Sequence, residues 1–309
     1  MSTFGHVVTA MVTPFDPQGR VDLEQAAALA QRLLSEGTDT LLVAGTTGES
    51  PTLTHDEKLS LFRAVKKAAG KAPVMAGTGS NDTAASVALT REAEACGVDG
   101  ILVVNPYYNK PPQEGLYRHF RAVAEATRLP VMLYNIPGRT GVNLEVSTLA
   151  RLSDLPNVIA VKEASGNLDQ VSETARVVGA AHGALHDGSP VARRPRDFQI
   201  YSGDDSLTLP MLSVGAVGVV SVVSHVAGRE IADMIAAWHR GDTRRAAALH
   251  ARLLPVFKGL FMTTNPIPVK AALKLKGFDA GGLRLPLVEA SQTQIDAIRS
   301  LLEEAGLLS

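Results

Sequence analysis

Eight short apolar runs, each rich in β-branched residues, constrain the fold of this chain more than any other feature. They begin near Val7, Thr40, Pro73, Gly100, Pro130, Val158, Phe198 and Gly218. Between them, apolar residues recur at helical spacing, as in residues 23–34 and 56–69. The runs are almost continuously apolar, which is typical of the strands of a parallel sheet that is covered by helices.

The number of these runs predicts a closed sheet. Strand–helix units repeated eight times in about 230 residues have the size and rhythm of an α/β protein of the (β/α)8, or TIM barrel, type. An open, doubly wound sheet is the alternative, but no Gly-x-Gly-x-x-Gly sequence opens the first helix. Asp22 and Thr54 are predicted N-caps of the first two helices, and Glu57 completes a capping box with Thr54.

The strand pattern stops after Val223. Helical patterns follow at residues 229–240, 243–260, 266–276 and 292–306. We therefore expect a catalytic barrel over residues 1–228 and a small C-terminal helical domain over residues 229–309. The rhythm breaks once before this, at an insertion of residues 179–197 between a helix and the seventh strand. A helix-to-strand connection of a barrel lies on its N-terminal face, away from the catalytic rim.

The composition excludes several classes of partner. The chain has 30 basic and 31 acidic residues, and these are interspersed, so neither a nucleic acid nor an anionic membrane is an expected partner. The longest nearly apolar stretch, residues 216–228, is too short to span a bilayer. The first residues lack the basic segment and apolar core of a signal peptide, so we expect a cytoplasmic protein.

Cysteine and histidine give little support for a redox or metal centre. Cys96 is the one cysteine, which excludes an internal disulfide, and its place in a helical stretch before a strand predicts a core thiol. His182, His186 and Asp187 lie in the insertion. Two histidines four residues apart without a third firm ligand indicate a surface loop, and we expect neither a metal nor a cofactor.

The run at residues 157–166 carries a lysine inside a strand pattern. Because side chains alternate between the two faces of a strand, Lys162 shares a face with Ala160 and Ala164. Burial on that face disfavours the ammonium form, and the neutral amine is the nucleophile that attacks a carbonyl to form a Schiff base. The competing interpretation is an edge strand whose lysine extends to water.

Polar residues also end other predicted strands, at the C-terminal rim where active sites of this fold form. Tyr134 shares the parity of Met132, and a phenol near a Schiff-base lysine can move protons. Arg139, on the loop that follows, has the fork geometry to bind a carboxylate. After the second strand, the hydroxyls and backbone N–H groups of residues 45–50 could hold a small carboxylate.

Two more loops reach the same rim. Residues 105–112 carry two tyrosines among prolines. These tyrosines could contribute to the site, or they could instead form a packing or subunit contact. Residues 202–205 add backbone and polar groups after the seventh strand. Amine, phenol, hydroxyl and guanidinium groups together suit carbanion chemistry on an α-keto acid, in which the imine acts as the electron sink.

These motifs resemble those of the dihydrodipicolinate synthase/N-acetylneuraminate lyase superfamily, which are class I pyruvate-dependent aldolases on a (β/α)8 barrel. The resemblance runs from the first strand to the C-terminal helices. It rests on Gly-Thr-Thr-Gly-Glu-Ser at 45–50, Asn-Pro-Tyr-Tyr-Asn at 105–109, Tyr-Asn-Ile-Pro-Gly-Arg-Thr-Gly at 134–141, Val-Lys-Glu-Ala-Ser-Gly at 161–166, Ser-Gly-Asp-Asp at 202–205 and Asn-Pro-Ile-Pro-Val-Lys at 265–270.

The resemblance implies roles for the catalytic residues. Lys162 is expected to form the imine with pyruvate. Tyr134, Thr46 and Tyr108 resemble the proton relay of the family, in which Tyr108 reaches in from a neighbouring subunit. The resemblance therefore also implies a homotetramer.

It implies substrate-binding roles as well. Thr47 and the backbone amide of Val220 resemble parts of the pyruvate carboxylate site and the strand-eight lining, with Gly203 nearby. Arg139 resembles the arginine with which the synthases hold the carboxylate of aspartate semialdehyde, and which the sialic-acid lyases typically lack. The expected reaction is the condensation of pyruvate with L-aspartate-4-semialdehyde in diaminopimelate and lysine biosynthesis.

Two alternatives to this reaction stay open at the level of sequence. One is another pyruvate aldolase or dehydratase of the superfamily, acting on a sugar acid. The other is a non-catalytic barrel that only binds a keto acid, although the presence of both Lys162 and Tyr134 argues against it.

The resemblance also bears on regulation. Lysine-inhibited members bind lysine at a subunit interface, where they commonly carry a histidine and a glutamate. The matching positions in this chain hold Lys58 and Ala85. A gained cation and a lost carboxylate both disfavour a cationic ligand, so we expect weak or absent inhibition by lysine.

Overall fold

The computed structural model describes residues 3–178 and 198–308. Within them, parallel strands follow one another in chain order around a closed barrel. The strands are β1 (Val7–Ala10), β2 (Thr40–Val43), β3 (Val74–Gly77), β4 (Gly100–Val104), β5 (Val131–Asn135), β6 (Val158–Glu163), β7 (Gln199–Ser202) and β8 (Gly218–Ser221). This architecture confirms the predicted (β/α)8 barrel over the open, doubly wound sheet.

The strands begin within one residue of the positions that the sequence predicts. The strands β3 and β5 start directly after Pro73 and Pro130, because proline has no N–H to donate to a ladder. The carbonyl groups of the two prolines still accept hydrogen bonds. The Pro73 carbonyl accepts from the Leu41 N–H at 3.1 Å, and the Pro130 carbonyl accepts from the Ile101 N–H at 2.9 Å.

Helices follow the strands and continue beyond the last of them. They are α1 (Leu23–Ser35), α2 (His55–Ala69), α3 (Thr83–Ala95), α4 (Gln113–Ala124), α5 (Pro137–Thr140), α6 (Val146–Leu152), α7 (Leu168–Val178), α8 (Thr208–Leu212), α9 (Ser224–His239), α10 (Thr243–Gly259), α11 (Ile267–Leu275) and α12 (Gln292–Glu304). Short 3-10 helices, η1 (Ser50–Thr52) and η2 (Asp205–Leu207), follow β2 and β7.

The predicted starts of the first two helices are confirmed at the level of single hydrogen bonds. The Asp22 carboxylate accepts from the Gln25 N–H at 2.9 Å. The Thr54 hydroxyl accepts from the Glu57 N–H at 3.2 Å, and the Glu57 carboxylate accepts from the Thr54 N–H at 2.8 Å. This reciprocal pair is the predicted capping box.

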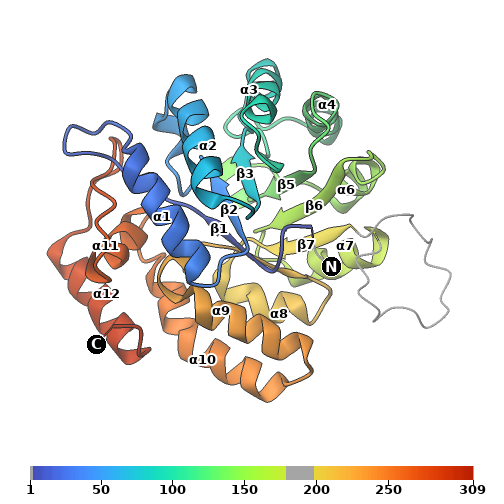
Figure 1. Cartoon of the computed structure of the whole chain (residues 1–309). Coiled ribbons are helices and arrows are strands. Elements are labelled where there is room, and N and C mark those ends of the chain that lie inside the picture. The colour runs from blue at the N-terminus through green and yellow to red at the C-terminus, as the bar shows by residue number, and fades with distance from the viewer. Residues whose placement is uncertain (1–2, 179–197, 309) are drawn as a thin grey trace. The chain divides into compact units, whose positions relative to one another are not determined.

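The chain divides into two compact units. The first unit holds Thr3 and the described part of residues 75–220. In it, helices α3, α4, α6 and α7 pack side by side in chain order (Figure 1). The register of its sheet sets Tyr134 of β5 against Lys162 of β6, and Lys162 against Tyr201 of β7. Three long side chains therefore lie at one level of three neighbouring strands.

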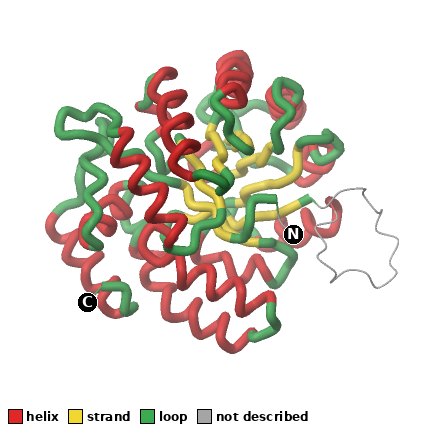
Figure 2. Tube along the Cα trace, viewed as in Figure 1, coloured by secondary structure: helices red, strands yellow, loops and turns green. Residues whose placement is uncertain are grey.

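The second unit holds residues 4–74 and 221–308. It brings the first part of the chain together with the last, because α9 packs on β1, on α1 and on α10. The helix α12 in turn packs on α10 and α11 (Figure 2). Gly228 allows the close approach of α9 to the end of α1, where a Cβ atom would collide with the Glu36 carbonyl oxygen.

The predicted boundary between residues 228 and 229 lies inside α9. This helix begins at Ser224 rather than at residue 229, and Ala227 departs from helical geometry with φ −140° and ψ 34°. The residues before the boundary are buried on all sides, so their sequence lacks the amphipathic pattern by which a helix is found. The division into domains at this point stays a prediction.

The sequence makes predictions for Cys96 and for the insertion at residues 179–197. Cys96 is the C-cap of α3 and is half-buried, so the prediction of a core thiol is wrong: the residue ends the helix instead of packing inside it. The insertion at residues 179–197, with His182, His186 and Asp187, lies outside the described residues.

No helix of the part that is described is both long and apolar enough to cross a membrane.

Candidate active site

The lysine that the sequence singled out lies on an interior strand of the first unit. The strand β6 pairs with β5 on one side and with β7 on the other, and Lys162 is 5% exposed. The interpretation of an edge-strand lysine that reaches water is therefore wrong. A cation in this position loses most of its hydration, which disfavours protonation of the amine.

Tyr134 lies against this amine. The two residues are register partners on β5 and β6, and the Lys162 Nζ atom is 4.2 Å from the centroid of the Tyr134 ring. The tyrosine is itself buried. The structure thus brings together the predicted nucleophile and the predicted proton-transfer group, with the amine over the face of the ring.

Burial lowers the pKa of Lys162 from 10.5 to about 7. The Asp205 carboxylate opposes this shift, and the Arg139 guanidinium adds to it by like-charge repulsion. At a pKa of about 7, half of the amines are neutral at neutral pH, against roughly one in three thousand for an ordinary lysine. A neutral amine can attack a carbonyl without a separate general base to deprotonate it.

Gly203 follows β7 directly beside this lysine. Its N–H donates to the Glu163 carbonyl at 2.8 Å. A Cβ atom on Gly203 would come within 2.6 Å of the Ala164 Cβ and 3.1 Å of the Lys162 Cγ. The small residues that the sequence placed around the lysine thus leave room for its stem, and a larger residue would displace it.

Arg139 and Tyr108 lie on neighbouring loops. Arg139 is exposed in the single turn of α5, and no carboxylate among the described residues forms an ion pair with it. Tyr108 is 89% exposed and has a φ of 74°. Its N–H donates to the Thr140 carbonyl at 3.4 Å, so the Tyr108 loop is held beside the Arg139 loop. Both side chains extend from the surface of the first unit.

The opposite face of β6 carries a buried carboxylate whose importance the sequence reading missed. Glu163 accepts from the Asn135 side chain at 3.1 Å, from Gln170 at 3.1 Å and from the Ser165 N–H at 2.7 Å. Asn135 in turn accepts from the Asn105 side chain at 2.9 Å. The network ties the ends of β4, β5 and β6 together. The sequence signal that could have revealed it is the polar residue at the end of each of these strands.

The predicted threonines belong to the second unit. Thr47 is buried, and its Oγ1 atom accepts a hydrogen bond from the Asn265 amide at 2.8 Å. Because the Thr47 oxygen accepts a hydrogen bond from the amide N–H, the Thr47 hydroxyl can still donate its own proton to another acceptor, such as a carboxylate. Thr46 is half-exposed in the same turn. Val220, the last predicted residue, is buried in β8 of the first unit.

The described residues contain no group of three or more His, Cys, Asp or Glu side chains that could hold a metal ion. A parallel barrel with a buried amine of lowered pKa at a strand end fits the class of lyases that work through a Schiff base.

Comparison with known proteins gives the family. The sequence matches the Dihydrodipicolinate synthetase family over residues 3–305. A 4-hydroxy-tetrahydrodipicolinate synthase of Desulforamulus reducens is 55% identical over 312 residues, which cover 100% of both chains. The chain belongs to the dihydrodipicolinate synthetase family.

Solved structures agree with this assignment. The dihydrodipicolinate synthase of Cyanidioschyzon merolae, solved with lysine bound, is 46% identical with a TM-score of 0.92 over 99% of both chains. A monomeric dihydrodipicolinate synthase variant is 44% identical with a TM-score of 0.91, covering 99% of this chain and 98% of the other. These comparisons confirm the predicted family and the predicted synthase subgroup.

The lowered pKa of Lys162 predicts its reactivity. Because only the neutral amine reacts, acetylation of Lys162 by trace acetic anhydride should rise through pH 7 and level off above about pH 8. Lys274 is an internal control, since a hydrogen bond from its ammonium to Asp279 raises its pKa and its labelling should still rise beyond about pH 10. Mass spectrometry of both peptides gives the two profiles. A midpoint near that of Lys274 would show that Lys162 is an ordinary lysine.

Proposed function

We propose that this chain catalyses the reaction of 4-hydroxy-tetrahydrodipicolinate synthase, the condensation of pyruvate with L-aspartate-4-semialdehyde. The single observation that carries the proposal is the buried amine of Lys162, with a pKa of about 7, against the ring of Tyr134. An amine that is neutral at neutral pH and shielded from water suits imine formation with an α-keto acid.

In the proposed reaction the Lys162 amine adds to the keto carbon of pyruvate, and water leaves to give a protonated imine. Loss of a methyl proton then gives an enamine, because the imine nitrogen accepts the electron pair. The enamine carbon bonds to the aldehyde carbon of the semialdehyde, and the aldehyde oxygen takes up a proton. Each proton transfer needs a group at hydrogen-bonding distance, and Tyr134 is the buried phenol beside the amine.

The proposed proton relay extends from Tyr134 to Thr46 and Tyr108. Tyr108 supports a role in an assembly, because a tyrosine that is 89% exposed on a backbone with φ 74° is held away from its own unit. We infer that it enters the site of a neighbouring subunit of a homotetramer. The existence of a monomeric variant in the family makes this inference testable by comparing activity with oligomeric state.

Substrate binding is assigned in the same way. Thr47 is proposed to donate to the pyruvate carboxylate, which the hydrogen bond from Asn265 supports. The Val220 amide and Gly203 are also proposed to take part in pyruvate binding. Arg139 is proposed to hold the semialdehyde carboxylate, and its lack of an ion pair among the described residues supports that role over a structural one. The protein is proposed to act in the cytoplasm.

The first test is chemical trapping of the imine. Borohydride with pyruvate should add pyruvic acid less one oxygen atom to the peptide that contains Lys162. The Lys162→Ala variant should lose this label and several orders of magnitude in turnover while it stays folded, because deleting a buried amine leaves only a small cavity. A label on another lysine, or no label on folded wild-type protein, contradicts the mechanism.

The second test separates the two substrates. Arg139→Ala should raise the KM for the semialdehyde about tenfold or more, since a charge-assisted bidentate contact contributes roughly 1.5–3 kcal/mol. Arg139→Lys is the matched variant that keeps the charge acting on Lys162 but loses the fork. Both variants should trap pyruvate like the wild type. An equal fall in pyruvate trapping means that Arg139 binds pyruvate or supports the fold.

The third test concerns inhibition by lysine, which the Cyanidioschyzon merolae enzyme binds. Lys58 is half-buried on α2, and Ala85 lies in the first turn of α3. Turnover measured across a lysine titration should show weak or no inhibition, and Ala85→Glu combined with Lys58→His should strengthen it. Half-inhibition of the wild type below about 1 mM, roughly −4 kcal/mol of binding, would refute the expectation.

A further inference from the structure

A buried ion pair in the second unit joins the threonine turn to α11. The Lys270 Nζ atom is 2.9 Å from the Glu49 Oε1 atom, and the two side chains are 4% and 1% exposed. The ammonium, which has three donors, also donates a hydrogen bond to the Gly282 carbonyl at 2.6 Å. It also lies 4.4 Å from the centroid of the Phe15 ring. Burial lowers the pKa of Lys270, and Glu49 opposes that shift.

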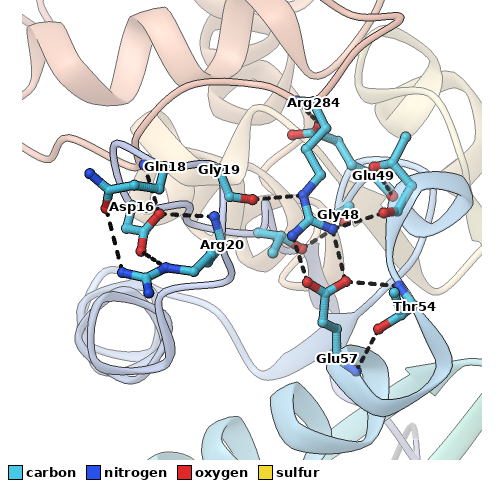
Figure 3. A network of polar contacts seen from close by, with 11 residues as sticks. Asp16, Gln18, Gly19, Arg20, Gly48, Glu49, Thr54, Glu57 and Arg284 are labelled. Carbon is cyan, nitrogen blue, oxygen red and sulfur yellow. Dashed lines mark hydrogen bonds and ion pairs between the residues drawn. The ribbon is translucent and has the colours of Figure 1, made fainter.

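The second oxygen of the same carboxylate is held from another side. The Arg284 N–H donates to the Glu49 Oε2 atom at 3.0 Å. The Arg284 guanidinium donates to the Gly19 carbonyl and to the Thr52 carbonyl, each at 2.8 Å, and pairs with the Glu57 carboxylate (Figure 3). We call Glu49, Lys270 and Arg284 the Glu49 clamp. Its three members come from the β2–α2 loop, from α11 and from the segment after α11.

The turn that the clamp holds is strained. Ala44 and Glu49, at its two ends, have φ values of 53° and 55°, in the left-handed region that non-glycine residues avoid. Between them, Gly48 has no room for a side chain, since a Cβ atom would come within 3.1 Å of the Met11 carbonyl oxygen. Backbone in this state persists only where the surroundings over-determine it. The clamp is the contact that fixes Glu49.

Stability alone gives a poor account of this pair. Removing two charges from water offsets much of their attraction, and apolar residues of similar size often stabilise a protein as well. The helix α11 also contributes Lys274 to an exposed pair with Asp279 at 2.9 Å. The buried pair differs from it in its burial and in its place, since its carboxylate belongs to the residue two positions after Thr47.

We propose that Lys270 and Glu49 are positioning residues for the reaction. They hold the strained turn of residues 45–50 in the one conformation in which Thr46 and Thr47 face the substrate. The inference rests on the proposed function, since it assigns these residues to the pyruvate step. A displacement of about 1 Å of a binding group can reduce a rate about a hundredfold, so loosening the turn should affect kinetics more than folding.

The test compares Lys270→Met, Glu49→Gln and Lys270→Arg with the control Lys274→Met. The full-length enzyme is assayed for kcat, for the KM of pyruvate, for the rate of borohydride trapping at Lys162 and for the melting temperature. Lys270→Met and Glu49→Gln should lower kcat/KM for pyruvate about tenfold or more in protein that is folded at the assay temperature. Lys270→Arg should recover part of the loss, and Lys274→Met should match the wild type.

Each outcome of this test either supports or refutes the positioning role of Lys270 and Glu49. If Lys270→Met melts at a lower temperature but keeps kcat, KM and trapping rate within about twofold, the pair is structural and the proposal is wrong. If Lys270→Met does not fold, Glu49→Gln is judged by the same criteria, because it keeps the shape of the side chain and an acceptor for the Arg284 N–H. If neither variant folds, Lys270→Arg, which keeps the charge, is judged by these criteria. If wild-type protein does not trap pyruvate at Lys162, the proposed function fails first, and this inference with it.

Discussion

The proposed chemistry of this protein depends on one buried amine. Lys162 lies on a strand that is paired on both sides and is 5% exposed, and this burial lowers its pKa to about 7. Arg139 pushes the pKa in the same direction and Asp205 pulls it back. The value therefore reflects a balance in which burial is the largest effect. At neutral pH about half of the amines are therefore neutral, which is the form that the proposed mechanism uses.

The same strand shows how differently a fold can treat two buried charges. Glu163, next in sequence and on the opposite face, receives hydrogen bonds from Asn135, Gln170 and the Ser165 N–H. These donors satisfy the carboxylate and lock the strand ends. Lys162 instead faces an aromatic ring. One face of β6 thus carries a carboxylate held by hydrogen bonds, and the other carries an amine against an aromatic ring.

The second unit illustrates how strain and anchoring go together. A turn that places Ala44 and Glu49 in the left-handed region is unfavourable in isolation, by about 1–2 kcal/mol for each residue. Contacts from distant parts of the sequence hold it in place, namely Asn265 on Thr47 and Lys270 with Arg284 on Glu49. Contacts from the chain beyond the last strand therefore hold the loop after β2, which carries the two threonines of the proposed site.

The sequence by itself determined the strand and helix pattern, because periodicity of apolar residues and capping chemistry at Asp22 and Thr54 are local properties. It also indicated Lys162 and Tyr134, since strand parity and strand ends can be counted along the chain. Other features arose only on folding. The ring-to-amine distance, the Glu163 network and the pairing of Glu49 with Lys270 join residues far apart in sequence, and no local pattern encodes such contacts. The start of α9 was also hidden, because a helix buried on all sides carries no amphipathic signal.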